Sequence, residues 1–87
     1  MVQVDGMNEF DVRDMDRFLA DVRAEILRAR KKHPGSRNTR HHCLAVLEEE
    51  VHELRMDVYA DRIPEGRKEA VQVAAMAVRF LMETPVR

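Results

Sequence analysis

Acidic residues in two parts of the chain have the spacing of ligands for a divalent cation. In a segment with helical periodicity, Glu53 follows Glu50 by three residues and Glu49 by four, so the carboxylates reach adjoining edges of one helix face. Glu69 and Gln72 lie on a later segment that is otherwise almost wholly apolar. Like charges at this spacing repel, and a hard cation that prefers oxygen ligands, Mg²⁺ or alternatively Mn²⁺, would relieve the repulsion. The competing interpretation is a solvated acidic face that binds no ligand.

Basic residues gather around the expected loop after the first helix. Lys and Arg side chains bind phosphates, and they also complement the C-terminal end of a helix, so both roles stay open. The candidate contacts to a substrate phosphate are Lys31, Lys32, Arg37 and, farther along the chain, Arg79. The chain has no Gly-rich phosphate loop, which excludes a P-loop enzyme.

The histidines and the single cysteine give a weaker signal. His41, His42 and His52 do not have the Cys/His spacing of a zinc site, so a histidine metal site is the less favoured alternative. His41 and His42 are interpreted as polar residues of a first helical turn. Cys43 is interpreted as a small buried hydrophobe.

Hydrophobic periodicity predicts three helices that would position these residues. The first runs from Glu9 to Lys32, where apolar residues step by three and four. Asn8 is a residue type that caps helix N-termini, and Asp11 suits the first turn. Basic residues in the last turn and the pair Pro34–Gly35 end this helix.

The second predicted helix runs from Thr39 to Asp61 and the third from Glu65 to Glu83. A turn over residues 62–66 would join them, and Pro64 within it suits the start of a helix. Antiparallel packing across this turn would bring the two acidic stripes together. Oxygen ligands from facing helices are a known way to build a metal site in a helical bundle.

The third predicted helix is apolar on nearly every side. Between Ala70 and Met82 the polar residues are Gln72 and Arg79 alone. A helix of this kind is buried on several sides, and two further helices of one short chain do not easily cover it. The sequence therefore predicts an all-α helical bundle that is completed by self-association, as a homodimer or homotetramer.

The composition limits the classes of function. Eighty-seven residues form one small domain, residues 1–87, and a chain of this size buries about 60–65% of its unfolded surface. The 15 basic and 16 acidic residues nearly balance, so net charge gives no argument for a nucleic-acid or membrane partner. No apolar stretch approaches the roughly 20 residues of a membrane span, and no signal peptide is recognised. One cysteine fits a reducing compartment, so a cytoplasmic location is expected.

Three segments in this order are typical of a known family. They are residues 29–34 (ARKKHP), residues 49–54 (EEVHEL) and residues 69–80 (EAVQVAAMAVRF). From about Val22 to Glu83 the chain resembles the MazG-like all-alpha nucleotide pyrophosphohydrolases, in particular small members associated with phages and mobile elements. The EExxEL element alone is weakly specific, whereas its combination with the later segment is much more specific.

The resemblance implies an all-helical fold that assembles as dimers or tetramers. It also implies Mg²⁺-dependent hydrolysis of nucleoside triphosphates to monophosphate and pyrophosphate. Glu49, Glu50, Glu53 and Glu69 match the acidic metal-binding positions of the family. Gln72 stands where better-characterised members have aspartate; its carbonyl oxygen is still a possible ligand, but its amide has no charge and cannot act as a base. The subgroup that this chain most resembles also tends to carry glutamine there, so a variant activity is an alternative to a weakened one.

These observations lead to three hypotheses. In the first, an enzyme holds Mg²⁺ with Glu50, Glu53, Glu69 and Gln72, and Glu49 orients or deprotonates the attacking water. In the second, a non-catalytic module binds or senses a nucleotide in the same cavity. In the third, a structural oligomer carries an acidic stripe without a ligand.

Overall fold

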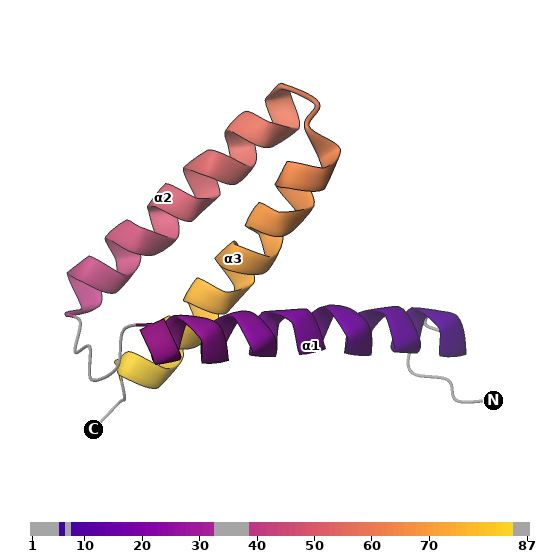
Figure 1. Ribbon diagram of the computed structural model, residues 1–87, viewed down its shortest axis with the longest axis horizontal. Helices are drawn as coiled ribbons and strands as arrows, with labels where there is room; N and C mark the ends of the chain where they lie inside the picture. Colours follow the sequence, from indigo (N-terminus) through magenta and orange to yellow (C-terminus); the bar gives the residue numbers. More distant parts are fainter. Residues whose placement is uncertain (1–5, 7, 33–38, 85–87) are drawn as a thin grey trace.

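The computed structural model describes residue 6 and residues 8–32 and 39–84, and the elements in these residues are all helices. The helices are α1 (Glu9–Lys32), α2 (Arg40–Tyr59) and α3 (Ile63–Glu83). Helices α2 and α3 form an antiparallel hairpin, and α1 runs across α3 (Figure 1). The prediction of an all-α protein is confirmed. None of the described helices is long and apolar enough to span a membrane.

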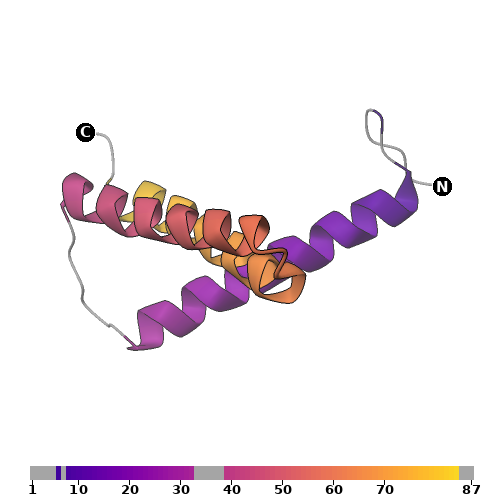
Figure 2. The ribbon, with the colours of Figure 1, turned by 90° about the horizontal axis from the view of Figure 1, so that it is seen from above.

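Helix α3 is the central element of the fold. It packs against α2 along the hairpin and against α1 where the two cross, while the described parts of α1 and α2 do not contact each other. Seen from above, α1 diverges from the hairpin, and its N-terminal half extends beyond it (Figure 2). The molecule is consequently extended, with dimensions of 43 × 37 × 23 Å.

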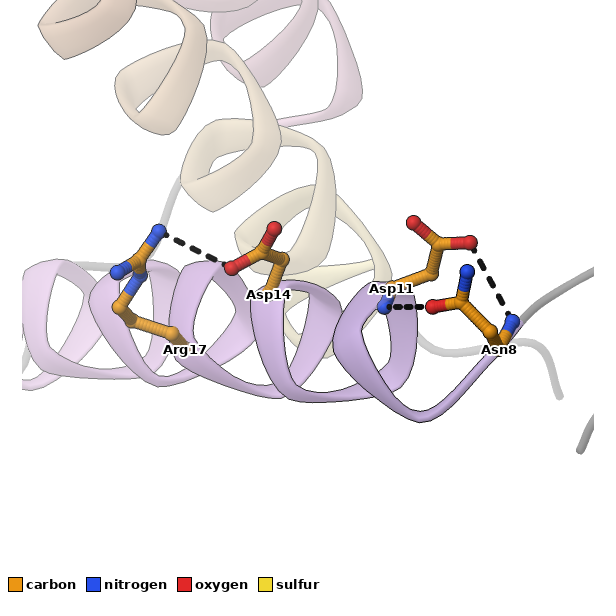
Figure 3. Close-up of polar contacts among 4 residues, drawn as sticks. All are labelled: Asn8, Asp11, Asp14 and Arg17. Carbon is orange, nitrogen blue, oxygen red and sulfur yellow. Dashed lines mark hydrogen bonds and ion pairs between the residues drawn. The ribbon is translucent and has the colours of Figure 1, made fainter. Parts of the chain in front are cut away.

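Helix α1 begins with a reciprocal cap. The Asn8 Oδ1 accepts hydrogen bonds from the backbone N–H groups of Phe10 and Asp11, both at 3.0 Å. The Asp11 carboxylate accepts one from the Asn8 N–H at 3.3 Å, and Figure 3 shows the two bonds between Asn8 and Asp11. These bonds satisfy N–H groups that a helix N-terminus otherwise leaves unpaired. The predicted bounds of α1 are confirmed, whereas Pro34–Gly35 lie outside the described residues.

The connection between α2 and α3 is shorter than predicted. Helix α2, which Thr39 caps, ends at Tyr59, and Asp61 has a left-handed backbone with a φ of 59°. Helix α3 begins at Ile63, so the predicted turn over residues 62–66 is wrong and residues 63–66 are already helical. The reason is that Pro64 needs no N–H partner in a first turn and has a φ suited to a helix. The helix therefore starts before this proline instead of after it.

The core of a single chain is small. Cys43 and Ala75 are the buried apolar side chains among the described residues, and Gly66 is the buried backbone position at the hairpin. The interpretation of Cys43 as a small buried residue is confirmed. Small residues at these positions allow α2 and α3 to approach closely, but they bury little apolar area. Larger apolar side chains of all three helices remain exposed.

We expect Gly66→Ala to stabilise the protein by about 0.5–1 kcal/mol, because glycine inside a helix costs conformational entropy. A Cβ at this position would lie 3.6 Å from the Cβ of Asp57 and 4.0 Å from Leu54 Cδ1, which are ordinary contact distances. The check is urea denaturation, with a higher midpoint at an unchanged m-value. Gly66→Val is the control, because its extra methyl groups reach these neighbours. A loss of stability in the alanine variant would contradict the described α2–α3 separation.

Candidate metal centre

Three glutamates from two helices meet near the turn of the hairpin. Glu50 and Glu53 are three residues apart on α2 and so share one face, and Glu69 comes from the facing helix α3. One carboxylate oxygen from each of the three residues lies within 4.8 Å of the others. The cluster is therefore a product of the antiparallel hairpin, which brings carboxylates from distant parts of the sequence to one place.

One oxygen of this cluster has no partner. Glu50 and Glu69 are half-buried and Glu53 is exposed. The Glu69 Oε2 is buried, yet it has no hydrogen-bond partner among the described residues. Buried polar atoms in proteins nearly always have a partner, and a carboxylate oxygen is a ligand that Mg²⁺ or Mn²⁺ accepts. This observation makes the donor set fit a hard divalent cation.

The electrostatics of the cluster favour bound protons when no cation is present. The charge of Glu69 is the main cause that raises the pKa of Glu53 above its ordinary value, with further contributions from burial and from Glu49 and Asp57. Burial is the main cause that raises the pKa of Glu69, followed by the proximity and charge of the Glu50 carboxylate. Both shifts are those of carboxylates that repel one another in partly desolvated surroundings. A divalent cation would reverse the effect by favouring the ionised forms.

Two further carboxylates surround the three. Glu49 is exposed on α2, and its charge acts on Glu53, which places it at the edge of the cluster. Asp57 also raises the pKa of Glu53 and Glu69, but its carboxylate forms an ion pair with Arg62 at 2.9 Å. The sequence analysis did not identify Asp57, although it follows Glu53 by four residues on the same helix face, and that spacing was the available signal.

Gln72 connects α3 to α1. It is half-buried one turn after Glu69, and its amide lies near the carboxylate of Glu25 on α1, whose pKa it helps to lower. Glu25 accepts a hydrogen bond from the Nε of Arg28 at 3.0 Å, and the Arg28 hydrogen bond is the main cause that lowers the pKa of Glu25. The polar stripe of α3 thus meets α2 through Glu69 and α1 through Gln72. A role of Gln72 as a metal ligand stays a prediction.

The sequence analysis did not identify Glu25 as a partner of Gln72. The two residues are far apart in the chain, and no short-range pattern gives the register of α1 on α3. The available signal was indirect: an amide such as that of Gln72 on an otherwise apolar helix needs a polar partner nearby.

The predicted phosphate contacts lie in different places. Lys31 and Lys32 are exposed in the last turn of α1, and Arg37 lies outside the described residues. Arg79 is buried and forms an ion pair with Glu83 at 2.8 Å. It is ten residues, or about 15 Å, along α3 from Glu69, so the structure does not bring Arg79 to the acidic cluster.

The histidines are not part of the cluster. His41, His42 and His52 are exposed on α2. In the part of the chain that the structure describes, Glu50, Glu53 and Glu69 form the one group of three or more possible metal ligands. The interpretation of His41 and His42 as polar residues of a first helical turn is confirmed, because α2 begins at Arg40 and both are exposed.

Comparisons with other proteins do not assign the chain to a family. No protein-family model matches it, and neither the curated proteins nor the solved structures contain a significant match. The similarity to MazG-like enzymes therefore stays a prediction from the sequence motifs. The geometry is that of three clustered carboxylates that could hold a hard cation.

We expect the metal-free protein to lose stability as the pH rises above about 4.5. The raised pKa values of Glu53 and Glu69 mean that the folded state holds protons more tightly than the unfolded state, where these groups titrate near 4.5. Their contribution to the stability of the folded state is complete below pH 4.5 and disappears as the pH rises through the raised pKa values of Glu53 and Glu69. Glu25 has a lowered pKa, so its own contribution is lost only as the pH falls below 4.5 and lies outside this window.

The measurement is the melting temperature between pH 4.5 and 7.5, with and without Mg²⁺. Mg²⁺ should oppose the loss, by about 2.7 kcal/mol at a concentration 100 times its dissociation constant. Glu53→Gln should flatten the metal-free pH dependence and reduce the response to Mg²⁺, whereas Glu48→Gln, an exposed neighbour on α2, should change neither. Melting that ignores both pH and metal would show that the carboxylates are a solvated acidic face.

We expect Gln72→Glu to destabilise the protein by about 0.5–1.5 kcal/mol, because it replaces a neutral amide that favours the Glu25 carboxylate with a like charge. The isosteric double variant Gln72→Glu with Glu25→Gln should recover much of this loss, since amide and carboxylate exchange places. Urea denaturation of both single variants and the double variant gives the coupling free energy. If Gln72→Glu instead stabilises the protein when Mg²⁺ is added, position 72 belongs to the metal centre.

Proposed function

We propose that this protein is an Mg²⁺-dependent nucleoside triphosphate pyrophosphohydrolase, which releases a nucleoside monophosphate and pyrophosphate. The observation that carries the proposal is the convergence of Glu50, Glu53 and Glu69, with an unpartnered buried oxygen on Glu69. A group of carboxylates that retains such an oxygen is suited to a hard cation, and sites of this type serve phosphate substrates. The resemblance of residues 49–54 and 69–80 to MazG-like enzymes points to the same chemistry.

The proposed mechanism assigns separate roles to the carboxylates. Glu50, Glu53 and Glu69 would hold the cation, which when bound neutralises triphosphate charge and lowers the pKa of water. Glu49 is exposed at the edge of the cluster and is the proposed general base. One water adds across the phosphorus–oxygen bond between the α- and β-phosphates, and Glu49 accepts a proton from it. Lys31 and Lys32, exposed at the end of α1, are the proposed contacts to substrate phosphate.

A second candidate function follows from Gln72. Its amide carries no charge, so the chain has four of the five acidic positions of the enzymes that it resembles. Fewer anionic ligands hold a cation less strongly. A module that binds or senses a nucleotide without hydrolysing it is therefore the alternative, and a structural helical oligomer is the remaining one.

We also propose that the protein works as a homo-oligomer, a homodimer or homotetramer, in the cytoplasm. The single chain exposes 7146 Å². A compact monomer of 10.2 kDa would expose about 5,300 Å². The excess is larger than the roughly 800 Å² that each partner contributes to a standard interface. One buried, unpaired cysteine, Cys43, suits the reducing cytoplasm.

The test of the proposed activity is release of pyrophosphate from a panel of NTPs and dNTPs with and without Mg²⁺. We expect Mg²⁺-dependent release, reduced about 10²- to 10⁴-fold by Glu49→Gln, because this substitution removes the base. Glu48→Gln is the matched control, an exposed neighbour in the same run of glutamates that should keep full activity. Binding of a non-hydrolysable nucleotide without turnover would identify the non-catalytic module. If the protein neither binds nor hydrolyses nucleotides, the structural helical oligomer is the remaining interpretation.

A further inference from the structure

An apolar groove lies between α1 and α3. Its volume is about 580 Å³, and its walls include Phe18, Leu19 and Val22 of α1 and Ala70, Val71 and Ala74 of α3. The groove is separate from the metal centre: Val71 follows Glu69 by two residues, which places the two side chains on nearly opposite sides of α3. Exposed apolar grooves with polar rims are typical of protein–protein interaction sites.

The groove has a defined wall and a charged rim. Two guanidinium groups lie over the Phe18 ring, that of Arg17 at 5.0 Å and that of Arg67 of α3 at 5.3 Å from the ring centroid. This contact joins α1 to α3 at the groove. Arg67 and Lys68 form a basic rim on α3, and Asp21 lies on the side of α1. The groove is thus a preformed feature of the chain and presents cations beside an apolar floor.

The N-terminal half of α1 has a matching character. It extends beyond the hairpin in both views (Figures 1 and 2), and its apolar residues include Phe10, 64% exposed, and Leu19, 58% exposed. The segment from Glu9 to Ala20 contains four carboxylates and two guanidinium groups, so it is acidic overall. An amphipathic helix with exposed apolar side chains and net negative charge complements an apolar groove with a basic rim.

The extended shape gives the area that such a contact requires. The radius of gyration is 15.1 Å, against about 12 Å for a compact domain of this length. The excess exposed area noted above is enough for more than one standard interface. Helix α1 provides both a wall of the groove and the projecting segment. In two copies related by a two-fold axis, the projecting segment of each copy can therefore cover the groove of the other.

We infer that a second copy of this chain docks on this groove, with the N-terminal half of α1 of each copy lying in the α1–α3 groove of the other. The inference rests on the proposed self-association and specifies its surface. The contact is isologous and covers Phe18 and Leu19 of both copies. It leaves the cluster of Glu50, Glu53 and Glu69 on the other side of α3 accessible to a nucleotide. Exposed apolar residues elsewhere, such as Leu81 at the end of α3, lie outside the contact.

The test compares two leucines that are both exposed in the single chain. Leu19→Glu places a charge in the proposed contact, while Leu81→Glu, at a position 72% exposed, is the matched control. We expect light scattering to give a wild-type mass of two or four subunits. Leu19→Glu should raise the dissociation constant about 100- to 1,000-fold, because a buried charge without a partner is not tolerated, and circular dichroism should show that helicity is kept. Leu81→Glu should retain the wild-type mass.

A second measurement uses the wild-type chain, in case Leu19→Glu does not fold. A mixture of isotopically light and heavy protein is treated with a carbodiimide, which joins lysine amines to nearby carboxylates. Links between Lys68 of one copy and Asp11, Asp14 or Asp16 of another are expected. Intermolecular links that all lie elsewhere would overturn the proposed surface but not self-association. Dissociation by Leu81→Glu and not by Leu19→Glu would do the same. A monomeric wild-type protein would overturn both self-association and the proposed surface, whereas the proposed activity is tested separately by pyrophosphate release.

Discussion

The antiparallel contact between α2 and α3 is the interaction on which the rest of the structure depends. A connection of residues 60–62 and small side chains at Gly66 and Ala75 hold the two helices close together. This closeness places Glu50 and Glu53 next to Glu69. The ionised carboxylates repel one another, and this repulsion contributes to the raised pKa values of Glu53 and Glu69. A hairpin that needed only to be stable would place opposite charges or apolar groups there. Local conflicts of this kind are expected at functional or strained sites, and the proposed cation site would account for this one.

The opposite end of the same hairpin treats charge differently. Arg79 and Glu83 form a buried ion pair at 2.8 Å, and the Cys43 Sγ lies 3.6 Å from the Glu83 carboxylate. Here the opposite charges neutralise each other within one turn of α3, although the Arg79 Nε is buried without a hydrogen-bond partner among the described residues. The two ends of the hairpin therefore provide an internal comparison. One carries a compensated pair, and the other carries carboxylates whose compensation has to come from a proton or a cation.

Local patterns in the sequence predicted the parts of the structure that local physics determines. The bounds of α1 follow from periodicity and from the cap of Asn8, and the spacing of Glu50 and Glu53 places both on one face of α2. The start of α3 was placed too late, because Pro64 is equally compatible with a turn and with a first helical turn. The contact of Gln72 with Glu25 depends on how α1 crosses α3. That crossing is set by packing between distant segments, which no short-range pattern encodes.

The two uses of α3 are coupled through its polar stripe. Glu69 belongs to the acidic cluster, and Gln72, one turn later, lies near the α1 residue Glu25. Since α1 contacts the rest of the described chain through α3, its position depends on that helix alone. Any ligand that orders the α2–α3 end also orders the surface against which α1 packs, and a partner that covers α1 and α3 stabilises the same helix from its other side. By linkage, cation binding and self-association should therefore favour each other even though their residues do not touch.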